Sequence, residues 1–224
     1  MINMKKQIFN TLAAVALIAG VVSCKGEKNE TEATDAQEVA VVEDAAKFIV
    51  DAAGSTIDWV GSKPTENHTG TINIESGVVN VAADAITGTF LIDMTSITVT
   101  DLAAGDGKES LEGHLKGEAE GKEDHFFNVA KYPTAAFEVT GVTEKDGKKM
   151  MQGNLTIRDQ KKNIEFPVSY TVEGENMTLT SEPFTIDRTE WGVNYGSKSV
   201  FDNLGDKFIS DDIQLTVNLK ATKA

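Results

Sequence analysis

The chain has 224 residues, a formal net charge of −14 and a single cysteine. One cysteine excludes an intramolecular disulfide, and the acidic balance disfavours nucleic acid, whose binding depends on neutralising phosphates with Lys and Arg. The same charge disfavours electrostatic docking on an anionic membrane, and we interpret it as a source of solubility.

The N-terminus has the pattern of a secretory signal. Lys5 and Lys6 precede an apolar stretch, residues 12–22, that is shorter than the roughly 20 residues needed to span a bilayer. A basic start, a short apolar core and small residues near a cleavage site predict a signal peptide over residues 1–23.

The end of this signal, Val21-Val22-Ser23-Cys24, resembles a bacterial lipobox, in which the cysteine becomes the lipidated first residue. The alternative is a chance cysteine after an ordinary signal; we favour lipidation because the position and the flanking residues agree. Two or three acyl chains on Cys24 would anchor the protein stably in a membrane. Lys25 is not an aspartate retention signal, which favours the outer membrane, with the protein facing either the periplasm or the exterior.

An acidic segment follows the cysteine. Residues 25–45 contain seven acids, two lysines and no aromatic residue. Such a segment cannot bury enough apolar surface to offset the entropy lost on ordering. We therefore predict a flexible acidic tether over residues 24–45 and one domain with a real core over residues 46–224.

The domain is dominated by runs in which apolar and polar residues alternate. Alternation with period two is typical of strands with one buried and one wet face. Short polar turns separate the runs, and the Asp-Gly pair within Glu144–Lys149 is a strong hairpin signal. This succession predicts an antiparallel barrel or sandwich, and no strand–helix–strand rhythm is present. The runs are residues 55–61, 70–75, 77–82, 87–94, 135–142, 153–159, 163–170, 176–180 and 212–220.

One long segment, residues 101–131, interrupts the strand pattern. Leu111 and Leu115 are four residues apart and so share one face of a short helix. Phe126 and Phe127 follow before the next strand. A long insertion in a compact β domain is usually functional or disordered, and its apolar residues favour an ordered lid with these four side chains turned inward.

The sequence offers little for catalysis by a familiar site. His68, His114 and His125 match no zinc-binding spacing, so we predict no metal. There is no nucleophile elbow and no phosphate loop or dinucleotide fingerprint. The histidines are more simply surface or loop residues, although His68 could stand at the rim of a barrel.

The stretch PFTIDRTEWGV, residues 183–193, is the strongest candidate for a site. Asp187 and Glu190 could act as acid and base. They flank Arg188, however, and a neighbouring arginine keeps carboxylates ionised. We favour an ion-paired cluster at a strand end, with Trp191 packed over the end of the barrel beside Gly192.

Several motifs together resemble the YceI-like family over residues 46–222. They are HTGTINI, GTFLIDMTSI, LEGHLKG, DHFFNVAKYPTAAFEVTGV, GNLTIRDQKKNIEFPV, PFTIDRTEWGVNYG and DDIQLTVNLKA. The segment GEAEGKED departs from the family by being longer and more acidic than the usual link. The resemblance implies an all-β fold, an extended eight-stranded antiparallel lipocalin-like barrel with a short helical lid. It also implies an apolar tunnel for a long isoprenoid amphiphile, of polyprenyl phosphate or quinone type, and no cofactor besides that ligand.

The resemblance suggests roles for particular residues, each of which could instead be plain core packing. Leu111, Leu115, Phe126 and Phe127 form the lid, and Arg188, His68 and Arg158 are candidates for a donor to the ligand's head group. The tunnel residues are Trp59, Phe90, Ile92, Phe137, Val139, Leu155, Phe166, Val168, Phe184 and Trp191, the last as a plug.

Three functions follow. The first is a non-catalytic carrier or store of isoprenoid lipid, anchored in the bacterial envelope through Cys24. The second is an enzyme acting on such a lipid, with Asp187, Arg188 and Glu190 at the mouth. The third is an envelope interaction module whose barrel is simply filled. Barrel edges and loops allow either a monomer or a homodimer.

Overall fold

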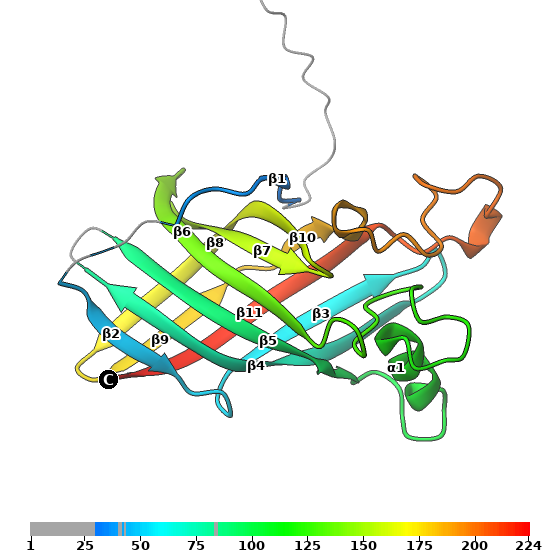
Figure 1. Ribbon diagram of the computed structural model, residues 1–224, viewed down its shortest axis with the longest axis horizontal. Helices are drawn as coiled ribbons and strands as arrows, with labels where there is room; N and C mark the ends of the chain where they lie inside the picture. Colours follow the sequence, from blue (N-terminus) through cyan, green and yellow to red (C-terminus); the bar gives the residue numbers. More distant parts are fainter. Residues whose placement is uncertain (1–29, 40–41, 43, 83–84) are drawn as a thin grey trace, which may run out of the picture.

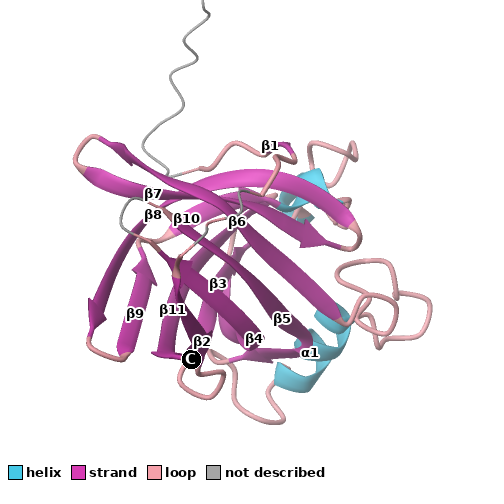
Figure 2. Cartoon of the chain, turned by 60° about the vertical axis from the view of Figure 1, so that its left-hand side comes forward, coloured by secondary structure: helices cyan, strands magenta, loops and turns pink. Residues whose placement is uncertain are grey.

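The computed structural model describes residues 30–39, 42, 44–82 and 85–224. Within them, eight antiparallel strands form a closed ring in the order β3-β4-β5-β6-β7-β8-β9-β11, and β11 returns to pair with β3 (Figure 1, Figure 2). The predicted all-β, eight-stranded, lipocalin-like barrel is therefore confirmed. The ring strands are β3 (Thr56–Ser62), β4 (Asn67–Val81), β5 (Ile86–Val99), β6 (Thr134–Lys145), β7 (Lys148–Ile157), β8 (Gln160–Glu173), β9 (Asn176–Ser181) and β11 (Asp212–Lys223).

Two further strands lengthen the ring. β11 pairs through its first part with β3 and with β10 (Phe184–Asp187), and through its last part with β9 and with β2 (Ala46–Val50). The long strand β4 likewise pairs first with β3 and then with β2. The barrel is therefore longer than its short strands, and Figure 1 shows this elongated shape.

Alternation along the strands sends apolar side chains into the barrel. In β9, buried Met177 and Leu179 alternate with exposed threonines, and in β5 Phe90 and Ile92 are buried while Leu91 between them is exposed.

The turns of two hairpins have the backbone conformation that their sequences predict. Residues 146 and 147 have φ of 53° and 75°, and residues 158 and 159 have φ of 48° and 59°. Two consecutive residues with positive φ form the tight turn that matches the twist of paired strands.

Glycines on the inner wall leave room for aromatic rings. A Cβ on Gly153 would fall 2.2 Å from the ring of Phe137, and one on Gly77 would fall 2.7 Å from the ring of Phe90. The rings therefore lie against the backbone of the neighbouring strand instead of crossing the interior. This arrangement widens the space inside a barrel of eight strands, which otherwise holds little more than its own side chains.

The predicted lid is present at one end of the barrel. Helix α1 (Lys108–Lys116) begins after Gly107 and ends at Gly117, both in left-handed conformation. Its Glu112 side chain accepts a 2.8 Å hydrogen bond from the amide of Val99 at the end of β5. After the helix, the amide of Phe127 donates to the carbonyl of Leu115 at 3.1 Å, so the loop folds back over α1.

Part of the predicted tether is instead built into the barrel wall. β9 pairs only with the last part of β8, so between the first part of β8 and β10 the wall has a gap. The N-terminal segment, residues 30–37, fills it: Thr31 donates from its amide to Thr185 of β10 at 2.8 Å, and its hydroxyl bonds to the backbone of Glu165 in β8. Strand β1 (Thr34–Asp35) then pairs with β8.

The same segment is fixed by a buried asparagine. Asn154, 2% exposed, accepts from the amide of Gln37 at 2.9 Å and donates to the carbonyl of Gln37 at 2.7 Å. The prediction of a flexible tether over residues 24–45 is thus wrong for residues 30–37. The composition predicted disorder because the segment has few apolar residues to bury. Hydrogen bonds of its backbone hold it in place instead.

Other predictions concern residues outside the described part of the chain. The signal peptide over residues 1–23, lipidation at Cys24 and the first residues of the tether, up to residue 29, fall there. Of the helices formed by the described residues, none is long and apolar enough to cross a membrane.

Candidate ligand-binding cavity

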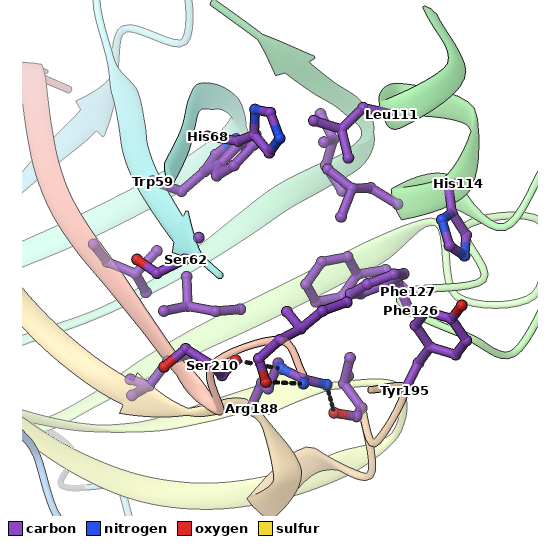
Figure 3. Close-up of a pocket in the computed structure, with 18 of the residues that line it drawn as sticks. Trp59, Ser62, His68, Leu111, His114, Phe126, Phe127, Arg188, Tyr195 and Ser210 are labelled. Atoms are coloured by element: carbon purple, nitrogen blue, oxygen red, sulfur yellow. Dashed lines mark hydrogen bonds between the residues drawn. The ribbon is translucent and has the colours of Figure 1, made fainter. Parts of the chain in front are cut away.

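The barrel encloses a cavity of about 540 Å³ at the lid end. This volume lies in the range of small-molecule binding sites. Its wall consists mainly of apolar side chains from β3, β4, β5, β7 and β11, and lid residues cover it (Figure 3). We call it the outer cavity. Charged residues of both signs, Lys63, Glu66, Asp206 and Lys207, also contribute to its lining.

A smaller cavity of about 80 Å³ lies next to it and is lined by apolar residues. We call it the inner cavity. Ile57, Ile92, Leu155 and Leu215 line both, so the two spaces are neighbours. Together they give the barrel an apolar interior that starts beneath the lid and continues along the strands.

Eight of the ten predicted tunnel residues lie in these walls. Trp59, Ile92, Leu155 and Trp191 line the outer cavity, and Phe90, Ile92, Phe137, Leu155, Phe166 and Phe184 line the inner one.

Val139 and Val168, also predicted to line the tunnel, line neither of these two cavities. Both are buried, but Val139 is in register with Gly88, which pairs in turn with Val79. Val79 and Val139 are both fully buried and neither lines a cavity, so side chains occupy the interior at this level. Strand alternation identified the inward face but not where along the strand the interior is hollow.

All four predicted lid residues, Leu111, Leu115, Phe126 and Phe127, line the outer cavity. An aromatic cluster joins the lid to the loop before β11: the ring of His125 stacks on Tyr195 at 3.9 Å, and Phe126 meets the same tyrosine edge-on at 5.5 Å. Figure 3 shows Phe126, His114 and Tyr195 gathered at one side of the cavity.

Two histidines form part of this cluster. His114 Nε2 lies 2.8 Å from His125 Nδ1, so the two rings share one hydrogen bond. Burial, and then the proximity of His125, lowers the pKa of His114. A hydrogen bond between two imidazoles requires one of the nitrogens to be an acceptor, and thus unprotonated. Across the described residues, no group of three or more His, Cys, Asp or Glu is placed to hold a metal ion.

Arg188 is buried beneath the mouth of the barrel and is 2% exposed. Its Nε donates to the carbonyl of Ser210 at 3.0 Å, and its terminal nitrogens donate to the carbonyls of Val193 and Ile209. Asp211 lies at 3.5 Å. The guanidinium therefore holds the start and the end of the loop between β10 and β11 together (Figure 3). Burial lowers the pKa of Arg188, an effect that Asp211 and Asp187 oppose.

The predicted ion-paired cluster of Asp187, Arg188 and Glu190 is wrong. The Asp187 carboxylate accepts from the amide and hydroxyl of Thr189, capping the short 3₁₀ helix η1 (Arg188–Trp191). Glu190 instead pairs with Lys162 at 3.2 Å. Neighbours in sequence turn to different sides here because the chain leaves the strand and begins a helical turn.

The other head-group candidates have different environments. His68 lines the outer cavity, and its Nδ1 lies 2.9 Å from Asp101. Partial burial acts to raise the pKa of Asp101, but hydrogen bonds from the Thr69 amide and from His68 outweigh it and lower the pKa. Arg158 lies outside the cavity lining; it pairs with Asp124 at 3.0 Å and donates to the carbonyl of Gly192.

Sequence reasoning missed several residues of the cavity wall. Ile213 and Leu215 were visible in the alternating pattern of the last strand, as were Ile57 and Ile72 in earlier strands. Tyr195 carried no signal, because it comes from an irregular loop without periodicity.

A closed antiparallel barrel of eight strands with an apolar interior and a lid at one end belongs to the class of lipocalin-like barrels, in which the interior has room for one small ligand. A family model described as YceI-like domain matches residues 48–221. The chain therefore belongs to the YceI-like family, as the sequence motifs predicted.

Solved structures agree on the fold. BcnA of Burkholderia cenocepacia is 22% identical with a TM-score of 0.56, and the match covers 77% of this chain and 99% of BcnA. A polyisoprenoid-binding domain from Saccharophagus degradans, implicated in plant cell wall breakdown, is 15% identical with a TM-score of 0.54, covering 81% and 100%. A comparison with curated proteins gave no match.

Replacing Arg188 with Met should destabilise the protein by about 3–5 kcal/mol, because three buried carbonyls lose a charged donor. Urea unfolding measures the change. Arg158→Met is the matched control: this arginine pairs with an exposed carboxylate, and we expect a loss below about 1 kcal/mol. Equal losses in the two variants would contradict the role given to Arg188.

Acidification should loosen the lid. The folded-state pKa of His114 lies below its ordinary value of 6.5, so below that pH the opened lid binds a proton that the closed lid does not. The stabilisation is complete above about pH 6.5 and declines as the pH falls toward the folded-state pKa. Hydrogen exchange at the amides of Phe127 and Val129, corrected for intrinsic rates, should show more opening at about pH 5.5 than at about pH 7.5.

The control for this experiment is His114→Gln, which removes the titrating group. Opening of the lid in this variant should depend less on pH than in the parent protein. Greater lid protection at the lower pH, or an unchanged pH dependence in the variant, would contradict the prediction.

Proposed function

We propose that this protein binds a long-chain isoprenoid lipid, of polyprenyl phosphate or quinone type, inside the barrel and carries or stores it without chemical change. The observation that carries the proposal is the apolar interior beneath the lid, formed by two neighbouring cavities of about 540 Å³ and about 80 Å³. The polyisoprenoid-binding domain from Saccharophagus degradans, which shares the fold, supports the same ligand class.

Apolar burial supplies the affinity for such a ligand. Each buried CH₂ contributes about 0.8 kcal/mol, so a chain of tens of carbons would formally exceed the practical ceiling near −18 to −21 kcal/mol. Ordering of the chain and incomplete desolvation consume the excess. Affinity is therefore easy to reach, and discrimination between ligands depends on chain length and on the few polar groups near the lid.

The alternatives have less support. A barrel that serves only as an interaction module has no need of an interior of this size, and it would be filled by side chains. An enzyme built on Asp187, Arg188 and Glu190 needs these groups to converge on one point. Instead Asp187 caps η1, Arg188 holds backbone carbonyls and Glu190 faces Lys162.

We also propose that the protein is anchored in the bacterial envelope through a lipidated Cys24, with the outer membrane favoured. The first described residue is Glu30, and five residues, 25–29, separate it from the cysteine in the sequence. Fully extended, they span roughly 20 Å. Lipidation would thus hold the barrel close to the membrane surface, within reach of a lipid ligand.

Organic extraction of the purified protein, followed by mass spectrometry, tests the ligand. Protein made in a host rich in quinones and polyprenyl phosphates should release one of them. Ala135→Phe places a ring in the outer cavity, which Ala135 lines, and should remove most of the bound lipid. Ala136→Phe is the matched control, since the next residue of β6 faces the opposite side of the wall.

Folded parent protein that releases no isoprenoid lipid would count against the proposal. Equal amounts of lipid from the Ala135 and Ala136 variants would move the ligand to a site outside the barrel.

Replacing Cys24 with Ser tests the anchor. The parent chain should sediment with membranes and incorporate labelled palmitate, whereas the Cys24→Ser chain should do neither and remain in the soluble fraction, because it lacks the acceptor for the acyl chains. A parent chain that is soluble and unlabelled would show that the cysteine is not an anchor.

A further inference from the structure

The two tryptophans of the chain differ in one respect. The indole N–H of Trp191 donates to the carbonyl of Leu155 at 3.0 Å. The indole N–H of Trp59 is buried and has no hydrogen-bond partner. Over the described residues only one other buried side-chain nitrogen or oxygen, Oδ1 of Asn194, shares this property, and Asn194 is not part of the cavity lining.

The position of Trp59 is fixed by the strand beside it. Trp59 lies in β3 directly opposite Gly70 of β4. A Cβ on Gly70 would fall 2.4 Å from Cζ2 and 2.5 Å from Cε2 of the indole. The ring therefore lies against the β4 backbone, and glycine is what permits it. The side chain is 8% exposed and belongs to the wall of the outer cavity (Figure 3).

A buried donor without a partner is unusual in folded proteins, because it has given up its hydrogen bond to water and gained none in return. Buried tryptophans generally find an acceptor for the N–H, as Trp191 does. A donor of this kind in the wall of a cavity can gain a partner from a ligand that brings an acceptor within hydrogen-bond distance of it.

The surroundings favour an uncharged acceptor. Apolar residues such as Ile57, Ile72 and Ile97 line the same cavity. Arg188, a buried cation of the lining, is already engaged with carbonyls and Asp211, and Lys63 of the lining pairs with Glu66 at 3.0 Å. A single neutral N–H cannot offset the cost of removing a phosphate from water. A carbonyl oxygen needs only one donor, and its desolvation costs much less.

We propose that Trp59 is a specificity-determining residue of the cavity: its indole N–H donates to an uncharged carbonyl-type oxygen on the head of the bound ligand. The inference rests on the proposed function, because it assumes that an isoprenoid chain occupies the barrel. It goes further by selecting neutral, carbonyl-bearing ligands over phosphate esters.

Three probes with one chain test this assignment: a geranylgeranyl ketone, the hydrocarbon in which a methylene replaces its carbonyl, and geranylgeranyl phosphate. The parent protein should bind the ketone roughly tenfold more tightly than the hydrocarbon, the effect of one hydrogen bond. Trp59→Phe, which keeps an aromatic ring and removes the donor, should abolish this difference, so that the ketone and the hydrocarbon bind with about equal affinity.

A second measurement follows the indole protons of the parent protein by NMR. In protein labelled with ¹⁵N-tryptophan, the ketone should shift the Trp59 indole proton downfield, whereas the hydrocarbon should not. The indole proton of Trp191, bonded within the protein, should keep its position with both probes. The spectrum of the Trp59→Phe protein assigns the two peaks.

The outcomes separate the two proposals. If none of the probes binds, the proposed function fails, and the assignment of Trp59 fails with it. If the hydrocarbon binds but the ketone gains nothing, or if Trp59→Phe weakens both alike, only the assignment falls. Tighter binding of the phosphate than of the ketone would also overturn it, and would point to cations at the mouth.

Discussion

The hydrogen bonds of Arg188 to three backbone carbonyls determine the shape of the barrel's mouth. β10 ends at Asp187 and β11 begins at Asp212, and the loop between them must both leave and rejoin the wall. The guanidinium accepts nothing and donates to Val193, Ile209 and Ser210, so it closes the base of this loop from inside. The same group lies 5.9 Å from the ring of Phe126, which places the lid over it. Lid, loop and barrel therefore meet at one buried charge.

The hollow interior depends on where the bulky aromatic side chains lie. Trp59, Phe90 and Phe137 are large enough to fill an eight-stranded barrel, yet each lies against a glycine of the neighbouring strand. The interior near the lid therefore stays hollow, whereas Val79 and Val139, toward the other end, are fully buried in the core. The two halves of the barrel have different roles. The filled half supplies the core that stabilises the fold, and the hollow half has room for a ligand without unfolding of the barrel.

The sequence predicted the fold well because alternation and turn chemistry are local. Period two put Phe90, Phe137 and Leu155 on the apolar side of their strands, and the family resemblance implied that this side lines the tunnel. The lid followed from the apolar residues of a segment without alternation. Partnerships between distant residues were not predictable. Arg188 was assigned to its neighbours Asp187 and Glu190, but three of its acceptors lie in residues 209–211, which the chain brings back only after a long loop. The order of residues 30–37 likewise depends on Asn154, more than a hundred positions away.

The polar groups around the cavity divide into those that build it and those left over. Arg188 holds a loop, Trp191 donates to Leu155, His114 and His125 bind each other, and His68 is held by Asp101. Each of these groups has a partner in the protein, and so gains less from a ligand than a group with none. Among the buried side-chain nitrogens and oxygens of the described residues in the cavity wall, the indole nitrogen of Trp59 is the exception. Apolar burial stabilises any long chain by about the same free energy per carbon. A barrel of this kind therefore discriminates between ligands through the polar atoms that it leaves unpaired. Here that atom is the indole nitrogen of Trp59.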